Sequence, residues 1–332
     1  MRSTTEVDLI AAERFGPIKH VIPEIEWPVH APYLAAIEKW KRERNAVILA
    51  HNYQTPEIYH GVADIVGDSL ALAVEASRTS ADVIVMAGVH FMAESAKLLN
   101  PEKTVLIPDL EAGCSLASSI SAADVRLLRE RYPDAPVVSY VNTTAAVKAE
   151  SDVCCTSSNA VEIVRALGAR RVIFLPDRYL ADYVAKQLPE VKVIAWEGSC
   201  EVHERFTGAE VRDYRSSHPG IVVLAHPECP PDVLAEADFV GSTAAMSRYV
   251  GDRKPASVVM ITECSMSDNV AAEHPEIEFV RPCNLCPHMK RITLPKILEA
   301  LENMRYEVTI DPLVAERARK SLERMLEHSL QK

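Results

Sequence analysis

The chain has 332 residues, with 36 Lys and Arg against 47 Asp and Glu, a formal net charge of −11 and 48% apolar residues. The apolar fraction excludes a disordered chain, and the negative charge argues against a nucleic-acid partner. A chain of this length exceeds what one hydrophobic core usually supports, so we expect two or three compact units.

The N-terminal segment, residues 1–30, mixes acidic and basic residues and has no apolar run of the kind a secretory signal needs. The longest apolar runs, such as residues 83–89, fall far short of the ~18 residues of a membrane span. We therefore predict a cytoplasmic protein without a membrane partner. Its eight cysteines would lie in a reducing compartment, where metal binding or catalysis is more common than disulfide formation.

The next predicted element is a helix that carries the one basic cluster of the chain, formed by Lys39, Lys41, Arg42 and Arg44. Acidic residues alternate with these bases along the helix. We interpret the cluster as a solvated surface rather than a phosphate-binding site.

A threefold repeat organises the rest of the sequence. Cys114, Cys200 and Cys286 follow one another at intervals of 86 residues. The apolar segments 136–142 and 221–228 correspond at the same interval, and a first copy that begins near residue 46 matches the second at an interval of 89 residues. Each copy reads as short β-branched strands, each ending in a polar loop, that alternate with helices. This alternation predicts a parallel sheet covered by helices on both faces.

A helix start follows each repeated cysteine by seven residues, at Ser121, Thr207 and Thr293. Serine and threonine favour the N-cap position, and Asp124 and Glu210 stand at the capping-box position of the first two helices. After the third of these helices, the pattern of residues 312–326 predicts an amphipathic helix, which we expect to pack on the first unit.

The predicted fold class is therefore α/β, with three pseudo-threefold-related αβα units of three layers each around a common centre. We assign residues 1–118 with 292–332 to the first unit, 119–204 to the second and 205–291 to the third. Units of this size exceed a solenoid repeat, which favours three small domains over a linear array.

The repeat aligns polar residues at the carboxyl ends of the predicted strands, where parallel sheets bind their ligands. If the three units close around one axis, equivalent residues from each unit meet there. Four triplets result: His51, Tyr140 and His226; Tyr53, Asn142 and Glu228; Ser69, Ser157 and Thr243; Cys114, Cys200 and Cys286.

Three cysteines around a point are suited to a 4Fe-4S cluster that leaves one iron without a protein ligand, whereas a pure electron carrier normally has four ligands. Each cysteine precedes a helix by a few residues, which we expect to favour the thiolate form. The alternative is that duplication copied a buried packing residue three times. The polar loops around all three cysteines favour the cluster.

The remaining cysteines have other interpretations. Cys283 and Cys286 form a CxxC motif, but without a second such motif a zinc site would lack half its ligands. The repeat register selects Cys286 as the ligand and leaves Cys283 either as a free thiol or as a disulfide partner. We interpret four further cysteines as packing residues: Cys154, Cys155, Cys229 and Cys264.

Glu228 is the only carboxylate of its triplet, and we predict that it acts as a general base. Its alternative interpretation is an acidic residue of a surface loop. His51 and His226 gain weight from their equivalent positions, whereas His203 has no counterpart in the other copies. We expect His203 to support the site rather than to bind substrate.

Several motifs resemble those of the quinolinate synthase family in order and spacing, over most of the chain from about His51 to Leu301. They are AHNYQTPEI, DIVGDSLALA, GVHFMAESAK, IPDLEAGCSLA, YVNTTA, CTSSNA, WEGSCEVH, AHPEC, GSTAAM and CPHMKRITL. The resemblance implies an enzyme of NAD biosynthesis with three αβα domains around a 4Fe-4S cluster held by Cys114, Cys200 and Cys286.

The resemblance also implies the condensation of iminosuccinate with dihydroxyacetone phosphate to quinolinate, with loss of phosphate and two waters. An L-aspartate oxidase would supply the iminosuccinate. Tyr53 would be catalytic, together with Glu228 and His51. The implied substrate contacts are His51, Ser69, Tyr140, Asn142, Ser157, His226, Glu228 and Thr243. Two alternatives stay open, namely another 4Fe-4S-dependent hydro-lyase and a non-enzymatic cluster carrier.

Overall fold

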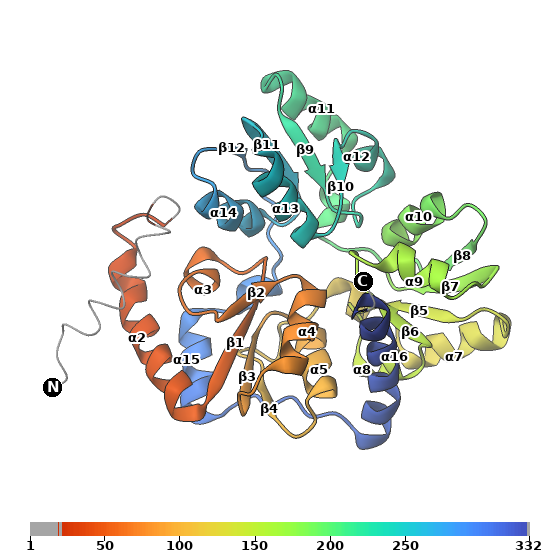
Figure 1. Ribbon diagram of the computed structural model, residues 1–332, viewed down its shortest axis with the longest axis horizontal. Coiled ribbons are helices and arrows are strands. Elements are labelled where there is room, and N and C mark those ends of the chain that lie inside the picture. The colour runs from red at the N-terminus through yellow and green to blue at the C-terminus, as the bar shows by residue number, and fades with distance from the viewer. Residues whose placement is uncertain (1–18, 20–21, 331–332) are drawn as a thin grey trace.

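Three parallel sheets of four strands form the framework of the computed structural model, which describes residue 19 and residues 22–330 (Figure 1). The first sheet has the order β2-β1-β3-β4, the second β6-β5-β7-β8 and the third β10-β9-β11-β12. Since the three orders are the same when each sheet is numbered from its own first strand, the sheets share one topology. The predicted α/β class with three similar three-layer units is confirmed.

The strands are short and parallel throughout. They are β1 (Ala46–His51), β2 (Ile65–Gly67), β3 (Val83–Ala87) and β4 (Thr104–Leu106); β5 (Val137–Tyr140), β6 (Val153–Cys155), β7 (Arg171–Leu175) and β8 (Lys192–Ala195); and β9 (Val222–Ala225), β10 (Phe239–Val240), β11 (Ser257–Ile261) and β12 (Glu278–Val280).

Helices lie between successive strands and around the sheets. They are α2 (Trp27–Arg44), α3 (Pro56–Tyr59), α4 (Ser69–Arg78), α5 (His90–Leu99), α6 (Ser115–Ser118), α7 (Ala122–Arg131), α8 (Ala145–Ala149), α9 (Ala160–Ala166), α10 (Arg178–Gln187), α11 (Gly208–Ser217), α12 (Pro231–Ala235), α13 (Thr243–Arg253), α14 (Cys264–Glu273), α15 (Leu294–Asn303) and α16 (Pro312–Leu330). Two short 3-10 helices, His203–Arg205 and Met289–Arg291, follow the loops that contain Cys200 and Cys286.

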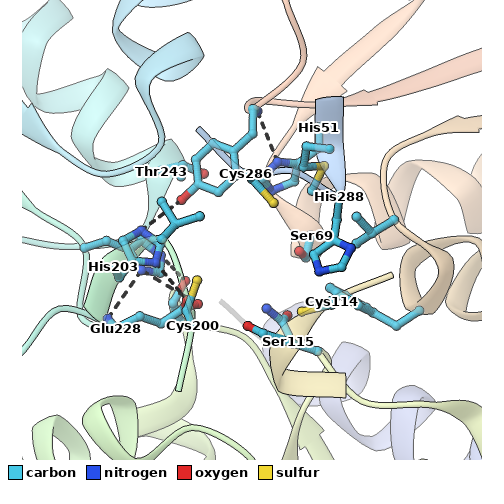
Figure 2. Close-up of a pocket in the computed structure, with 18 of the residues that line it drawn as sticks. His51, Ser69, Cys114, Ser115, Cys200, His203, Glu228, Thr243, Cys286 and His288 are labelled. Carbon is cyan, nitrogen blue, oxygen red and sulfur yellow. Dashed lines mark hydrogen bonds and ion pairs between the residues drawn. The ribbon is translucent and has the colours of Figure 1, made fainter. Parts of the chain in front are cut away.

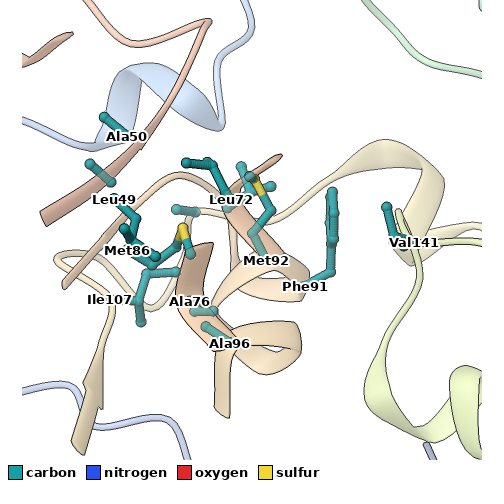
Figure 3. Close-up of a cluster of buried hydrophobic side chains, with 14 of the residues drawn as sticks. Leu49, Ala50, Leu72, Ala76, Met86, Phe91, Met92, Ala96, Ile107 and Val141 are labelled. Carbon is teal, nitrogen blue, oxygen red and sulfur yellow. The ribbon is translucent and has the colours of Figure 1, made fainter. Parts of the chain in front are cut away.

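The central strands are buried on both faces, which explains their continuous apolar sequences. In β3 every residue from Val83 to Ala87 is buried. Figure 3 shows how Leu72 of α4 and Met92 of α5 pack beside Met86 of this strand. The core of the first unit therefore lies directly beneath the carboxyl ends of its strands.

The predicted helix starts agree with the structure. Ser121 and Thr207 each accept a hydrogen bond from the backbone N–H three residues later, and Asp124 and Glu210 complete capping boxes with them. Thr293 caps α15 in the same way, without a capping box. These caps fix where each helix leaves the preceding cysteine loop.

One expectation about helices was wrong and another was incomplete. Lys41 is not on a solvated surface, because its side chain is buried and its ammonium group binds Glu38, Asp64 and the carbonyl of Val62. The C-terminal helix α16 packs across the first and second units, largely on the second, rather than on the first alone.

Hydrogen bonds along α16 show this arrangement. Arg319 donates to the carbonyl of Leu98 in the first unit, whereas Ser321 donates to the carbonyl of Lys148 in the second. The amphipathic pattern predicted that the helix would be half-buried, but not which unit would cover it. The division of the chain into three units remains a prediction, with boundaries at 1–118 with 292–332, 119–204 and 205–291. Within the described residues, no helix is long and apolar enough to cross a membrane.

Candidate active site and metal centre

A cavity with about 690 Å³ of space, part of it open to solvent, lies where the three units meet (Figure 2). All twelve members of the four predicted triplets line it. Convergent polar groups in a concave site are typical of small-molecule binding. The structure thus brings together residues from three units that lie far apart in the sequence.

The sulfurs of Cys114, Cys200 and Cys286 point toward the same space between the units (Figure 2). Each sulfur lies within hydrogen-bonding reach of two backbone N–H groups, those of the second and third residues after the cysteine. The donors are Leu116 and Ala117 for Cys114, Val202 and His203 for Cys200, and His288 and Met289 for Cys286. Such N–H groups stabilise negative charge on sulfur.

Burial nevertheless raises the pKa of all three thiols, to about 12 for Cys114, and outweighs the backbone donors. The backbone N–H groups at the helix starts favour the thiolate form, as expected, but they do not by themselves ionise the buried thiols. A bound metal would have to supply the positive charge that ionises these sulfurs. Three soft sulfur ligands with paired N–H donors fit an iron-sulfur cluster.

A single metal ion would need a tighter set of ligands. Among the described residues, one group of possible ligand atoms lies within 4.8 Å of one another, and it consists of Cys200, His203 and Glu228. Both ring nitrogens of His203 already have hydrogen-bond partners, so we interpret this group as a hydrogen-bond network. The three cysteine sulfurs do not all lie within that distance of one another, which is compatible with a cluster of several irons rather than a single ion.

Two buried acids lie beside the backbone of two cysteine loops. The carboxylate of Glu263 accepts a hydrogen bond from the backbone N–H of Cys286 at 3.3 Å. Asp177, at the equivalent position of the second unit, lies near the backbone N–H of Cys200, which lowers the pKa of its carboxyl against burial. Each acid also caps the helix that it precedes, so both acids are fixed to the framework of their own units.

Glu228 is at the centre of a buried hydrogen-bond network. Tyr140 donates to Glu228 Oε1 at 2.5 Å, and His203 Nδ1 lies 3.0 Å from Oε2. On the other side of its ring, His203 Nε2 lies 2.9 Å from the hydroxyl of Thr262. That hydroxyl lies 2.7 Å from the hydroxyl of Tyr53. A carboxylate only accepts hydrogen bonds, so Nδ1 carries the proton and Nε2 accepts from Thr262, which in turn accepts from Tyr53.

The charge state of this network follows from its contacts. Burial alone would raise the pKa of Glu228, but the adjacent His226 and His203 rings and the hydrogen bonds from His203 and Tyr140 lower this pKa below its usual value, so the carboxyl is ionised. Burial and the charge of Glu228 raise the pKa of Tyr53 well above its usual value. At neutral pH the network therefore has an ionised acid at one end and a protonated phenol at the other.

His51 and His226 are buried as neutral rings. Burial lowers the pKa of each to about 3, against the opposing charge of Glu228. The Nδ1 atom of His51 accepts the N–H of Tyr53 at 3.1 Å, and that of His226 accepts the N–H of Glu228 at 3.4 Å. In both rings the proton is therefore on Nε2. His226 donates it to Ser157 at 3.2 Å.

The hydroxyl triplet and Asn142 add neutral polar groups to the cavity. Ser69 and Thr243 are the first residues of α4 and α13 and line the cavity, so the N-termini of these two capped helices face the same space. The Oδ1 atom of Asn142 is buried and has no hydrogen-bond partner within the described chain. These groups can bind carboxylate or phosphate oxygens, or a substrate N–H or O–H, without added side-chain charge.

Sequence reasoning missed several residues of the site. Thr262 and His288 have no polar counterparts in the repeat, and His203 was expected only to support the site. His288 lines the cavity and lies 3.0 Å from Glu201, next to Cys200. A search for residues at equal intervals in the three copies cannot identify residues that only one unit contributes.

The other cysteines lie outside the cavity lining. Cys154, Cys155 and Cys229 are fully buried, as their interpretation as packing residues predicts. Cys264 is buried as well, but its sulfur lies 3.4 Å from that of Cys283, which is exposed. Cys283 therefore faces Cys264 rather than the common centre of the three repeated cysteines.

Comparison with known proteins agrees with this geometry. Residues 35–327 match the family model described as Quinolinate synthetase A protein. The chain is 69% identical over 316 residues to Quinolinate synthase 1 of Mesorhizobium japonicum, which covers 95% of this chain and 97% of that protein. It is 64% identical over 325 residues to Quinolinate synthase of Agrobacterium fabrum, covering 98% and 94% of the two chains. A relative from Xylella fastidiosa with the same name is 66% identical over 293 residues, covering 88% and 86%.

Proposed function

The chain belongs to the quinolinate synthetase A family and is an enzyme of that type, and from this premise we propose that it condenses iminosuccinate with dihydroxyacetone phosphate to quinolinate. The reaction releases phosphate and two waters. The observation that supports this proposal most directly is one cavity lined by three cysteines, two neutral histidines and a buried proton-transfer network.

We infer that Cys114, Cys200 and Cys286 hold a 4Fe-4S cluster. Their sulfur-only donor set and the paired backbone N–H groups around each sulfur support this assignment. When bound, such a cluster would supply an iron with an open position, a Lewis acid toward a substrate oxygen or nitrogen.

Substrate binding falls to the neutral polar groups of the cavity. Both substrates are anionic, and the N-termini of α4 and α13 offer positive potential without a side-chain cation. The proposed contacts are His51, Ser69, Tyr140, Asn142, Ser157, His226, Glu228 and Thr243. His51 can donate from Nε2 to a carbonyl or carboxylate oxygen while it remains uncharged, and His226 can do so if a substrate oxygen replaces Ser157 as its acceptor.

Proton transfer falls to the network that ends at Glu228. A proton can leave the Tyr53 hydroxyl through Thr262 to Nε2 of His203, and the ionised Glu228 stabilises the resulting imidazolium. Tyr53 can then accept a proton from the substrate and return it to a departing hydroxyl. Glu228 thus assists Tyr53, which acts as the base at the cavity. His51 lies beside Tyr53, with ring centroids 4.6 Å apart.

The proposed function is tested by anaerobic incubation of the iron-loaded protein with iminosuccinate and dihydroxyacetone phosphate. We expect quinolinate and phosphate in equal amounts, identified by mass spectrometry and a phosphate assay. Phosphate release without quinolinate, or no reaction in protein with full iron content, would contradict the assignment. Product identity also separates this function from that of another cluster-dependent hydro-lyase.

Glu228→Gln tests the proton network. The amide keeps the shape of the side chain but removes the charge that stabilises a protonated His203, so we expect kcat to fall at least a hundredfold while the iron content stays unchanged. Single-turnover quinolinate formation and iron analysis measure the two effects. Normal turnover by this variant would remove Glu228 from the mechanism.

The source of the substrate and the cellular location of the protein are also proposals. We infer that an L-aspartate oxidase supplies iminosuccinate, because this imine hydrolyses in water, and that the protein works in the cytoplasm. The alternative of a non-enzymatic cluster carrier is excluded by membership of an enzyme family.

A further inference from the structure

We propose that Lys148 and Asn269 are positioning residues of the active site, each of which binds the two main-chain carbonyls that flank a functional side chain. Lys148 would position Asn142, and Asn269 would position Tyr53. The inference rests on the proposed function, because Asn142 is a proposed substrate contact and Tyr53 a proposed proton carrier. Neither Lys148 nor Asn269 lines the cavity.

Lys148 lies on α8 with its side chain fully buried, at 0% exposure. Its ammonium group donates to the carbonyl of Val141 at 2.7 Å and to the carbonyl of Thr143. These two carbonyls stand immediately before and after Asn142. The ammonium group therefore draws both neighbouring peptide groups to one side of the loop.

Asn269 makes the same contact in the first unit. It lies on α14 of the third unit and is 1% exposed. Its Nδ2 atom donates to the carbonyl of Asn52 at 3.0 Å and to that of Gln54 at 2.8 Å. These carbonyls flank Tyr53, which occupies the position equivalent to Asn142 in the repeat.

Duplication cannot have copied this contact, because the two donors come from unrelated places. Lys148 belongs to the same unit as the loop that it binds, whereas Asn269 reaches across from another unit. Two different residue types thus bind the same pair of carbonyls from different directions. A shared requirement for the shape of the loop explains this recurrence.

The free-energy cost of burying Lys148 also supports a positioning role. Desolvation lowers the pKa of the Lys148 ammonium, against the opposing charge of Glu94. A well-packed apolar side chain would avoid this penalty at a buried position. The ammonium group instead lies 5.5 Å from the ring centroid of Phe91, a residue of the cavity lining.

The carbonyl of Tyr140, two residues before Asn142, is also bound by a side chain of the same loop. The hydroxyl of Thr143 donates to the carbonyl of Tyr140 at 3.1 Å. With the carbonyls of residues 140, 141 and 143 all bound inside the protein, the side chain of Asn142 faces the cavity with its Oδ1 unpaired. In the third unit the equivalent Glu228 follows Pro227, whose ring fixes the backbone φ covalently.

The inference predicts different kinetic effects for the two substitutions. Lys148→Met removes both donors and should raise KM at least tenfold with kcat changed less than threefold, because Asn142 binds substrate. Asn269→Leu should lower kcat at least tenfold with a smaller change in KM, because Tyr53 carries the proton. Matched controls are Lys41→Met and Asn100→Leu, which remove a buried lysine and a buried asparagine that bind carbonyls away from the cavity.

A double-mutant cycle tests the link to Asn142. If Lys148 acts through Asn142, then Lys148→Met combined with Asn142→Ala should raise KM no further than Asn142→Ala alone. All variants are compared at equal iron content and with melting temperature measured. Wild-type KM in folded Lys148→Met, wild-type kcat in folded Asn269→Leu, or additive effects in the cycle would overturn the proposal.

A second variant covers the case in which Lys148→Met does not fold. In Lys148→Gln the amide nitrogen stops one bond short and cannot reach both carbonyls, so we expect KM to rise at least threefold. A wild-type KM in this variant would also overturn the proposal. If the wild-type protein makes no quinolinate, the proposed function fails instead, and the two failures are distinct.

Discussion

The two strand-end histidines show how burial sets the chemistry of single residues in this site. A ring whose Nδ1 accepts a backbone N–H has its proton fixed on Nε2, and the buried position keeps the ring uncharged. His51 and His226 are therefore neutral donors toward the cavity. We expect anionic substrates to be bound by hydrogen bonds and helix N-termini rather than by charged histidines.

This burial predicts that the protein loses stability in mild acid. Below pH 6.5 the unfolded chain binds protons at His51 and His226, whereas the folded chain does not until about pH 3. Unfolding is therefore favoured as the pH falls, by about 2 kcal/mol for each histidine between pH 7 and pH 5. Denaturant unfolding across this range at constant salt measures the effect.

The variant His226→Gln provides the control for the pH profile. It removes one of the two buried rings, so its free energy of unfolding should depend less steeply on pH than that of the wild type. Equal slopes for the two proteins, or a flat profile for the wild type, would show that these rings are protonated in the folded state.

The cysteine substitutions separate the cluster ligand from its neighbour in the CxxC motif. Cys200→Ala should lose iron and activity together, because it removes one of three sulfurs that point to the common centre. Cys283→Ala should keep both, because its sulfur faces Cys264. Iron content after anaerobic purification decides. A Cys283→Ala protein without iron would mean that the repeat register selected the wrong cysteine.

Much of the site could be predicted residue by residue, since equal intervals in the sequence become equal positions in space. The twelve residues of the four triplets all reach the cavity for this reason. Thr262, Lys148 and Asn269 could not be found in this way. Their importance lies in contacts that one unit makes and the others do not, and only the folded chain reveals them.

At the level of elements, the sequence predicted the strands and the helix starts well. Buried parallel strands require continuous apolar runs, and capping boxes require particular residues three positions apart, so both leave clear patterns. The packing of α16 left no such pattern. An amphipathic helix shows which of its faces is buried, but its partner depends on the path of the preceding loop.

Substitution of Leu322 tests how much the packing of α16 contributes to the stability of the protein. Its side chain is fully buried between the units, so Leu322→Ala should destabilise the protein by about 2 to 5 kcal/mol. Leu313→Ala is the matched control, because this leucine of the same helix is 76% exposed and should cost less than about 0.5 kcal/mol. The denaturant midpoints of the two variants and the wild type measure these effects. Similar effects would show that α16 is not held by its apolar face.

At the level of the whole molecule, the site exists only when all three units are assembled. Each unit contributes one repeated cysteine, and hydrogen bonds such as that from Asn52 to Thr243, at 2.9 Å, join the first unit to the third. The core of the first unit continues into the second through Phe91 and Val141 (Figure 3). Assembly and catalytic competence are therefore linked.

Removal of iron should loosen this assembly. A ligand that binds the folded state alone stabilises it by mass action, so we expect anaerobic treatment with an iron chelator to lower the melting temperature by at least about 5 °C. Calorimetry of loaded and stripped protein measures the shift, with Cys200→Ala as the variant that should show none. Equal melting temperatures would mean that the cysteines hold no metal that connects the units.

The threefold repeat has a consequence for the course of the reaction. Three identical loops would form a symmetric ring that a substrate could enter in three equivalent orientations. The positions held by Tyr53, Asn142 and Glu228 have instead diverged into a phenol, an amide and an acid, so every orientation meets a different set of partners. We therefore expect the regiochemistry of the proposed reaction, the choice of which carbon atoms become joined, to depend on this loss of symmetry at the three equivalent positions.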